Sequence, residues 1–514
     1  MLHPPANTAC CYSVLEVNFV SKKLAASRYN QQRPHPLSFF QGFHQEVRLR
    51  LGIAALVVLV TIPVTAYGHA EIFFPKLFSP AELATSGFVL LNPDPLTATV
   101  YVCLLSASGP PPPPQELCTP TILTIPPGGQ LARLGTDLFP NATAPGWVYV
   151  LNDTEGMQAF WLSYNADLTF MDGAAAAGYD TIGADQILPL VAGETELNII
   201  NPNFIAVTVT IRLFGPDGPL APAVTRGIPI AGALQVQVSD LFPSADMAQA
   251  RYLRVASSSA TAAIASSGVI RGFMVSTETL VVNGVNVSAG LEMTFPHVVT
   301  GKVSGADYTT VFGITNLSPS SQTVSIMFYA DAGDPITVVR TLKAGESLRE
   351  TAQILFGLTS DFQSGWVSVR GTAAITGFAG YSDAVGGGLA VVPAATAQTK
   401  LFFSHIANGP PQWQTGLALL NTTGNAVNVD VYAMHPNGSP IGATRFTLGA
   451  GRKTAKVIHE LIPQTAGVNG GFVFVSADAP VHGIELFYTH DLKVLSNVAA
   501  GRLEPGVSYT PPLP

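Results

Sequence analysis

The strongest constraint on the fold is a pattern that recurs four times after a single hydrophobic segment. An asparagine anchors each copy, and successive anchors are 109, 115 and 105 residues apart: Asn92, Asn201, Asn316 and Asn421. This period matches the size of one β-sandwich domain, whereas propeller blades and solenoid units repeat at about 20–50 residues. The sequence therefore predicts a string of four such domains.

Alternating apolar residues flank every anchor. They lie four and two positions before the asparagine and eight and ten positions after it, as Leu197, Ile199, Val209 and Ile211 do around Asn201. Side chains two residues apart lie on the same face of a strand, and the residues between the two runs are turn formers such as NPDPL and NPNFI. Each unit is therefore predicted to open with a β-hairpin.

Two further landmarks follow each anchor in the same order. The first contains a leucine and is interpreted as a helical turn that crosses between sheets: Leu138-Phe139-Pro140, Leu241-Phe242-Pro243, Leu355-Phe356 and Leu461-Ile462-Pro463. The second is an aromatic residue that leads a strand and is expected to fill a sandwich core: Trp147, Tyr252, Trp366 and Phe472.

These landmarks predict an all-β fold of four tandem Ig-like or fibronectin-like β-sandwich domains after an N-terminal signal or anchor segment. The expected domains, called repeats 1 to 4 below, span residues 71–182, 183–292, 293–398 and 399–506, and residues 507–514 form a tail.

The N-terminal region predicts export. Residues 51–67 are uncharged and apolar, Arg48 and Arg50 precede them, and small residues end the segment at Ala70. This order is typical of a secretory signal, and an uncleaved membrane anchor is the alternative. Residues 47–70 are therefore assigned as a signal peptide or N-terminal anchor. Residues 1–46 fit neither and are explained by a start site placed too far upstream.

Charge argues against nucleic acid as a partner. Charged residues make up 11% of the chain, against about 25% in typical domains. After residue 50 the chain has 19 basic and 31 acidic residues, so it repels a phosphate backbone. Membrane contact is expected only through the N-terminal segment, if that segment is retained.

Two cysteines flank a proline-rich insertion in repeat 1. Cys103 ends a predicted strand, Cys118 opens the next apolar run, and SASGPPPPPQEL lies between them. Export favours a disulfide between Cys103 and Cys118, and two free thiols are the alternative.

The search for chemical motifs predicts neither catalysis nor a cofactor. The sequence contains no GxSxG, P-loop, GxGxxG or HExxH pattern. Asp331 and Asp334 could hold Ca²⁺ from a loop, but a turn is the preferred interpretation. No metal site is predicted.

Aromatic residues near strand ends are the best binding candidates, because flat rings stack on sugar faces and on protein partners. The candidate ligand contacts are Trp413, Trp161 and Tyr164, and Tyr381 and Tyr488 belong to the same class. The alternative is that these rings fill sandwich cores.

The order of strand, Asn-Pro turn, Leu-Phe-Pro and aromatic-Val-x-Val resembles uncharacterised Ig-like repeats of secreted bacterial proteins, from residue 71 to about 505. The resemblance implies a spacer or adhesive module and no particular site residues. We expect an exported structural or interaction protein without catalytic activity, at the cell surface or outside the cell. One alternative is an adhesin that binds carbohydrate or a cell-surface protein through loop aromatics. Another is an extracellular hydrolase with an interdomain site, which clustered carboxylates or histidines in an interdomain cleft would favour.

Overall fold

The computed structural model describes residues 70–110, 118–165, 171–178, 181–274, 279–287, 290–303, 305–359, 361–409, 413–498, 500–503 and 509–512. Contacts within the chain group Gly68–Pro514 into one compact unit, separate from Met1–Tyr67. The leader and nearly all of the predicted signal segment lie outside the described residues. None of the helices in the described ranges is long and apolar enough to cross a membrane.

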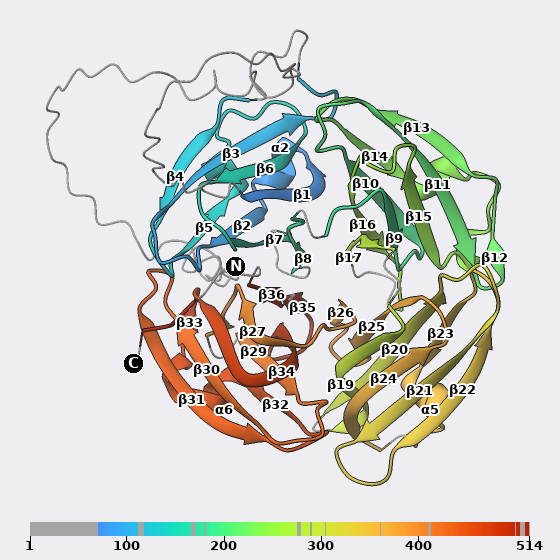
Figure 1. The fold of residues 1–514 in the computed structure, drawn as a ribbon, viewed down its shortest axis with the longest axis vertical. Coiled ribbons are helices and arrows are strands. Elements are labelled where there is room, and N and C mark those ends of the chain that lie inside the picture. Colours follow the sequence, from blue (N-terminus) through green and yellow to red (C-terminus); the bar gives the residue numbers. More distant parts are fainter. Residues whose placement is uncertain are drawn as a thin grey trace, which may run out of the picture. The chain divides into compact units, whose positions relative to one another are not determined.

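The fold is all-β, and one order of strands recurs in the four repeats (Figure 1). Repeat 1 contains β1 (Ala70–Phe78), α2 (Pro80–Leu83), β2 (Ser86–Leu91), β3 (Ala98–Ser106), β4 (Thr121–Ile125), β5 (Gln130–Leu134), α3 (Gly135–Leu138), β6 (Gly146–Asn152), β7 (Gln158–Tyr164) and β8 (Met171–Ala175). Repeat 2 contains β9 (Asp185–Leu188), β10 (Glu194–Ile200), β11 (Val207–Gly215), β12 (Gly218–Pro219), β13 (Val224–Ile228), β14 (Ala233–Gln237), α4 (Val238–Leu241), η2 (Met247–Gln249), β15 (Tyr252–Ser257), β16 (Ala265–Arg271), β17 (Thr279–Asn283) and β18 (Val285–Asn286).

The second half of the chain repeats this order. Repeat 3 contains β19 (Glu292–Val303), β20 (Ala306–Asn316), β21 (Gln322–Ala330), β22 (Ile336–Leu342), β23 (Ser347–Thr351), α5 (Ala352–Phe356), β24 (Gln363–Gly371), β25 (Ile375–Asp383) and β26 (Leu389–Pro393). Repeat 4 contains β27 (Gln398–Phe403), β28 (Ala407–Asn408), β29 (Trp413–Leu420), β30 (Val427–Met434), β31 (Pro440–Leu448), β32 (Lys453–Val457), α6 (Ile458–Leu461), η3 (Pro463–Thr465), β33 (Val468–Asn469), β34 (Phe472–Thr489), β35 (Leu495–Val498) and β36 (Gly501–Arg502).

Each repeat builds two antiparallel sheets by the same scheme, and in repeats 3 and 4 the two sheets are joined into one eight-stranded sheet, through the pairing of β19 with β20 in repeat 3. In repeat 1 the strand orders are β1-β6-β3-β4 and β5-β2-β7-β8, and the corresponding strands of the other repeats pair in the same way. In repeat 4 the sixth and seventh strands are a single continuous strand, β34. It pairs with β27 and β30 near its start and with β29 and β35 near its end.

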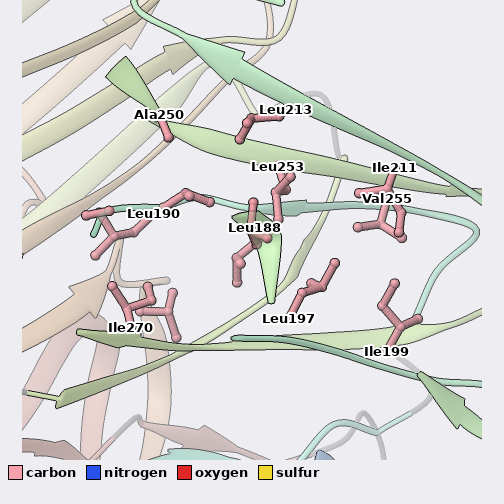
Figure 2. Close-up of a cluster of buried hydrophobic side chains, with 14 of the residues drawn as sticks. Leu188, Leu190, Leu197, Ile199, Ile211, Leu213, Ala250, Leu253, Val255 and Ile270 are labelled. Carbon is pink, nitrogen blue, oxygen red and sulfur yellow. The ribbon is translucent and has the colours of Figure 1, made fainter. Parts of the chain in front are cut away.

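The hydrophobic core of each repeat lies between its two sheets. Figure 2 shows this in repeat 2, where Leu197 and Ile199 of β10 face Ile211 of β11 and Leu253 of β15. All four of these side chains are fully buried. The alternation around the anchor asparagine therefore places apolar side chains of both flanking strands in one core.

The prediction of a β-hairpin across each anchor is wrong. The strand before the anchor and the strand after it belong to different sheets, as β2 pairs with β5 and β7 while β3 pairs with β4 and β6. The chain therefore crosses from one sheet to the other at each asparagine. Alternation alone did not distinguish these arrangements, because either one gives two strands with a single buried face.

The anchor asparagine holds this crossing together. In repeat 2 the Asn201 side chain is fully buried, and its Nδ2 donates to the carbonyl oxygens of Ile205 at 2.8 Å and Pro229 at 2.7 Å. Its Oδ1 accepts from the backbone N–H of Asn203 at 3.0 Å. The same network recurs in the other repeats, at Asn92, Asn316 and Asn421. An asparagine is suited to this position because its amide both donates and accepts.

The Leu-Phe-Pro segments are short helical turns, as predicted. They form α3, α4, α5 and α6, and each carries the chain from the fifth strand of one sheet to the sixth strand of the other. Leu138, Leu241 and Leu355 are buried in these turns, so the recurring leucine seals the edge of the core.

The expectation that the strand-leading aromatics fill sandwich cores is corrected by the structure. Trp147 is buried in a cluster that also contains Ile200 and Ala231 of repeat 2, and its Nε1 donates to the Ala231 carbonyl at 3.0 Å. In the same way Tyr252 Oη donates to Gly345 of repeat 3 at 3.0 Å, and Trp366 Nε1 donates to Gly451 of repeat 4 at 3.2 Å. These rings are amphipathic, with a polar tip that needs a partner when it is buried, so they join one repeat to the next.

The acceptors are equivalent turn residues, each two positions before the fifth strand and each with a positive φ. The angles are 46° at Ala231, 71° at Gly345 and 66° at Gly451, and the corresponding residue of repeat 1 is Gly128 at 61°. The left-handed turn leaves the carbonyl free for the aromatic donor of the preceding repeat. In repeat 4 the aromatic is Phe472, which has no donor, and Tyr509 lies against Gly128 instead.

Repeat 4 also packs on repeat 1. The Gln130 side chain of β5 is buried, and its Nε2 donates to the carbonyl oxygens of Ser404 at 2.9 Å and Gly471 at 3.1 Å. Its Oε1 accepts from the Gly471 N–H at 3.1 Å. The four repeats therefore form a closed cycle of contacts, and they are not spaced along an extended string.

The last strands of the four repeats meet one another. Strand β8 contacts β17 and β35, and β26 contacts the same two strands. The buried Asp172 of β8 accepts from the Val281 N–H of repeat 2 at 2.8 Å and from the Ser496 hydroxyl of repeat 4 at 2.7 Å. One carboxylate thus links three of the repeats.

The disulfide between Cys103 and Cys118 is present, as predicted, with a Cα–Cα distance of 5.9 Å. Replacing both cysteines by alanine is expected to lower stability by about 3 kcal/mol, because the unfolded chain loses a closed loop of this length. Urea unfolding without reductant measures the loss. Adding dithiothreitol to the wild type should produce a similar shift, and a wild-type midpoint that reductant leaves unchanged would contradict the prediction.

Candidate functional site

A cavity of about 510 Å³ lies between repeats 3 and 4. Strands β19, β20 and β25 of repeat 3 and β29, β32 and β34 of repeat 4 contribute residues to its walls. Its polar lining includes His297, Asp331, Ser364, Tyr381, Lys453 and Glu460. The volume is within the range of about 300–1,000 Å³ that is usual for small-ligand pockets.

Small residues on β29 leave room for this cavity. Gly416 and Ala418 lie five and three positions before the anchor Asn421, and both line the cavity. The equivalent residues of repeat 2 are Glu196 and Asn198, and both interact with residues of repeat 1 at the interface between the two repeats. Glu196 lies 3.9 Å from the Lys76 ammonium, and Asn198 accepts the Leu77 N–H at 3.1 Å.

Lys453 lines the cavity, and its side chain is 3% exposed. Its Nζ lies 2.8 Å from Ser364 Oγ, 3.1 Å from His297 Nδ1 and 3.3 Å from Asp331 Oδ2. All three partners belong to repeat 3. Lys453 is the first residue of the fifth strand, where the other repeats have Gln130, Ala233 and Ser347. At the other junctions this position holds an uncharged residue, whereas at the junction of repeats 3 and 4 it holds a charged lysine.

Burial controls the protonation of His297 and Lys453. Burial and the nearby Lys453 ammonium hold the pKa of His297 well below its ordinary value, so the imidazole is neutral near pH 7. Burial also lowers the pKa of Lys453, and the Asp331 carboxylate opposes this shift. A lysine ammonium only donates, so His297 Nδ1 is the acceptor in their contact.

Tyr381 fixes the backbone of His297. Its hydroxyl donates to the His297 carbonyl at 2.6 Å, and the two rings are stacked with centroids 6.2 Å apart. Burial raises the pKa of Tyr381 above its ordinary value, so the phenol keeps its proton. These contacts hold the imidazole in place beside Lys453.

Three aromatic rings form another part of the lining. Tyr308 and Phe362 contact each other edge to face with centroids 6.3 Å apart, and Phe362 is 39% exposed. Burial, with smaller contributions from Tyr308 and Glu460, raises the pKa of Tyr488 to about 12. Tyr308, Tyr488 and Glu460 all line the cavity.

The candidate ligand contacts from the sequence do not lie in this cavity. Trp161 is fully buried with its ring edge against Phe78 at 5.3 Å, and Trp413 is 6% exposed and lies 6.0 Å from Phe487. This burial corrects the expectation that the two tryptophans offer surfaces for stacking. Tyr164 is half-buried at the end of β7, far along the chain from Trp413. Apolar rings at the ends of buried strands are taken into the interior because their burial is favourable.

Some of the residues that line the cavity are also candidates from the sequence, although no cavity is predicted there. The sequence predicts Tyr381 and Tyr488 as candidate binding aromatics and Asp331 as a turn residue, and all three line the cavity. His297 and Lys453 were missed, because 156 residues separate them. The available signal was that Lys453 departs from the uncharged residues at the same position of the other repeats.

Glu485 is a separate buried acid in β34. It is fully buried, and neither carboxylate oxygen has a hydrogen-bond partner in the described part of the chain. It pairs with Leu417, at the position where the other repeats have Trp161, Gly268 and Ala379. Burial raises the pKa of Glu485 well above its ordinary value of 4.5.

Replacing Glu485 by glutamine is expected to remove a pH-dependent loss of stability. Because the folded-state pKa is raised, wild-type stability falls as the pH rises from the ordinary value of 4.5 towards the raised value. Thermal unfolding should therefore show the variant gaining on the wild type between pH 5 and pH 8. The exposed Glu155→Gln is the control. A difference between Glu485→Gln and wild type that does not change with pH would contradict the prediction.

Within the described ranges, no three His, Cys, Asp or Glu side chains are grouped so that they could hold a metal ion. A scan against protein families finds no match for this chain, and a search of curated proteins finds none either.

Proposed function

We propose that the protein is an exported, non-catalytic interaction protein in which four Ig-like β-sandwich domains act as one rigid body. The two four-stranded sheets of repeat 1, and the same order of strand pairing in the other units of about 105 residues, support the Ig-like assignment. The basic and apolar order of residues 48–67 supports export through a signal peptide or anchor, to the cell surface or beyond.

The closed cycle of contacts carries this proposal. A spacer gains reach from flexible or extended joints. In this chain Trp147 and Gln130 bind a neighbouring repeat through buried hydrogen bonds, and Tyr252 and Trp366 do so through part-buried ones. A rigid body loses little conformational entropy on binding, which favours recognition over spacing. The expected partners are a carbohydrate or a cell-surface protein, as in an adhesin.

The test is binding of the purified full chain to glycan arrays and to intact cells, together with a panel of chromogenic ester, peptide and glycoside substrates. We expect specific binding and no turnover. Turnover that survives repurification would overturn the non-catalytic proposal. Absence of binding to every glycan and cell type would overturn the interaction proposal.

One observation favours a second function, a hydrolase with an interdomain site. Ser364 Oγ lies 2.8 Å from the buried Lys453 Nζ, and both line the cavity. Serine and lysine form a nucleophile and base in some hydrolases. The Asp331 carboxylate disfavours this role, because it stabilises the ammonium form that cannot accept a proton. Labelling by a fluorophosphonate probe that disappears in Ser364→Ala would establish the hydrolase. We expect no labelling of either protein.

A further inference from the structure

We propose that the cavity between repeats 3 and 4 binds an uncharged saccharide, and this inference rests on the proposed interaction function. At this junction Gly416 and Ala418 take the place of the larger Glu196 and Asn198, which are the equivalent residues at the junction of repeats 1 and 2, and both small residues line the cavity. At the junction of repeats 2 and 3, the equivalent Val311 packs with Phe273 in a hydrophobic cluster. Local departures from the pattern of a fold are expected at functional sites.

The charges of the lining favour an uncharged ligand. Lys453 is paired with Asp331, and His297 is neutral. The buried Asp383 already accepts the backbone N–H groups of Asp307 at 2.6 Å and Gly386 at 2.5 Å.

The remaining ionic groups of the lining are Lys456 and Glu460, which have opposite signs. An anionic or cationic ligand would therefore lose hydration without gaining an unpaired counter-charge. An uncharged polar ligand avoids this cost.

The walls match the two surfaces of a sugar ring. Tyr308, Phe362 and Tyr488 contribute aromatic side chains to the lining, and Val299 and Leu486 contribute aliphatic ones. The C–H faces of a pyranose pack on such apolar walls, while its hydroxyl edges need donors and acceptors. The phenol groups of Tyr308 and Tyr488 and the carboxylate of Glu460 supply both kinds of partner.

Gly416 allows a sharp test of this site. A Cβ added there would meet the Tyr488 ring at 3.4 Å, an ordinary contact, so a larger side chain fits only by entering the cavity. Gly87 is the matched control, because it also lies five positions before its anchor, and a Cβ added there meets no atom within 4 Å. Gly416→Phe should fill the cavity, and Gly87→Phe should leave it open.

The experiment is saturation-transfer NMR and calorimetric titration of the full chain with cellobiose, maltotriose, mannobiose and N,N′-diacetylchitobiose. Glucuronic acid and glucosamine serve as charged comparators. We expect the wild type and Gly87→Phe to bind at least one neutral saccharide and neither comparator. Gly416→Phe should bind at least tenfold more weakly. Tyr488→Phe, which removes only a hydroxyl, should bind several-fold more weakly and decides the question if Gly416→Phe does not fold.

The outcomes separate this inference from the function on which it rests. Saccharide binding that survives in Gly416→Phe, or no binding of these probes by the wild type, overturns the cavity site. Array or cell binding that is unchanged in Gly416→Phe would at the same time leave the interaction function standing. Hydrolysis of a bound saccharide would instead overturn the non-catalytic proposal and keep the site.

Discussion

Replacing Asn201 by aspartate is expected to lower the free energy of unfolding by about 3–5 kcal/mol, the usual effect of leaving a buried charge without its partner. The two side chains have nearly the same shape, so the change removes the donor and leaves the packing. In the wild type Nδ2 donates to the carbonyl oxygens of Ile205 and Pro229. The aspartate would place a carboxylate against the same oxygens in a fully buried site.

Urea unfolding followed by tryptophan fluorescence measures this loss. The loss should shrink at low pH, because a protonated carboxyl can donate one hydrogen bond. Asn437→Asp is the matched control, since Asn437 is exposed and its Oδ1 only accepts, from the Ser439 N–H at 3.0 Å and hydroxyl at 2.7 Å. We expect the control to change stability by less than about 0.5 kcal/mol. An Asn201→Asp protein as stable as this control would refute the role of the anchor.

Trp147→Ala is expected to cost about 3–5 kcal/mol, as large-to-small substitutions in packed interiors do. Trp147 is 1% exposed and lies between repeats 1 and 2, so the variant loses packing at a junction. Trp147→Phe keeps most of the ring but leaves the Ala231 carbonyl without its donor. Its expected cost is about 1–3 kcal/mol.

Differential scanning calorimetry tests the closed cycle directly. Because every repeat contacts two neighbours, the wild type should unfold in a single transition. Opening the junction between repeats 1 and 2 should lower that transition or divide it into two. Leu96→Ala is the control, because Leu96 is 56% exposed and should have little effect. A wild type with several independent transitions would mean that the repeats behave as a string.

The cavity between repeats 3 and 4 could not be predicted from the sequence. The sequence marks Tyr381, Tyr488 and Asp331 only as single candidate residues, and no local pattern joins them to His297 or Lys453. The cavity exists because Gly416 and Ala418 lie across a junction from residues of repeat 3. A junction between repeats is formed by residues from distant segments and has no sequence periodicity of its own. No single segment of the sequence therefore predicts a cavity there.

The sequence by itself determined the all-β class, the four recurring units, the helical turns after the fifth strands and the disulfide of repeat 1. These follow from local rules, since alternation, turn formers and cysteine spacing act over a few residues. Only the tertiary structure decided that the anchors cross between sheets, that the aromatics join repeats and that repeat 4 closes on repeat 1. The physical reason is that burying an apolar face lowers the free energy whichever surface covers it, so the apolar pattern does not specify the partner surface. The partner of each face is chosen by fit and by hydrogen bonds such as those of Gln130, whose partners are more than 270 residues away.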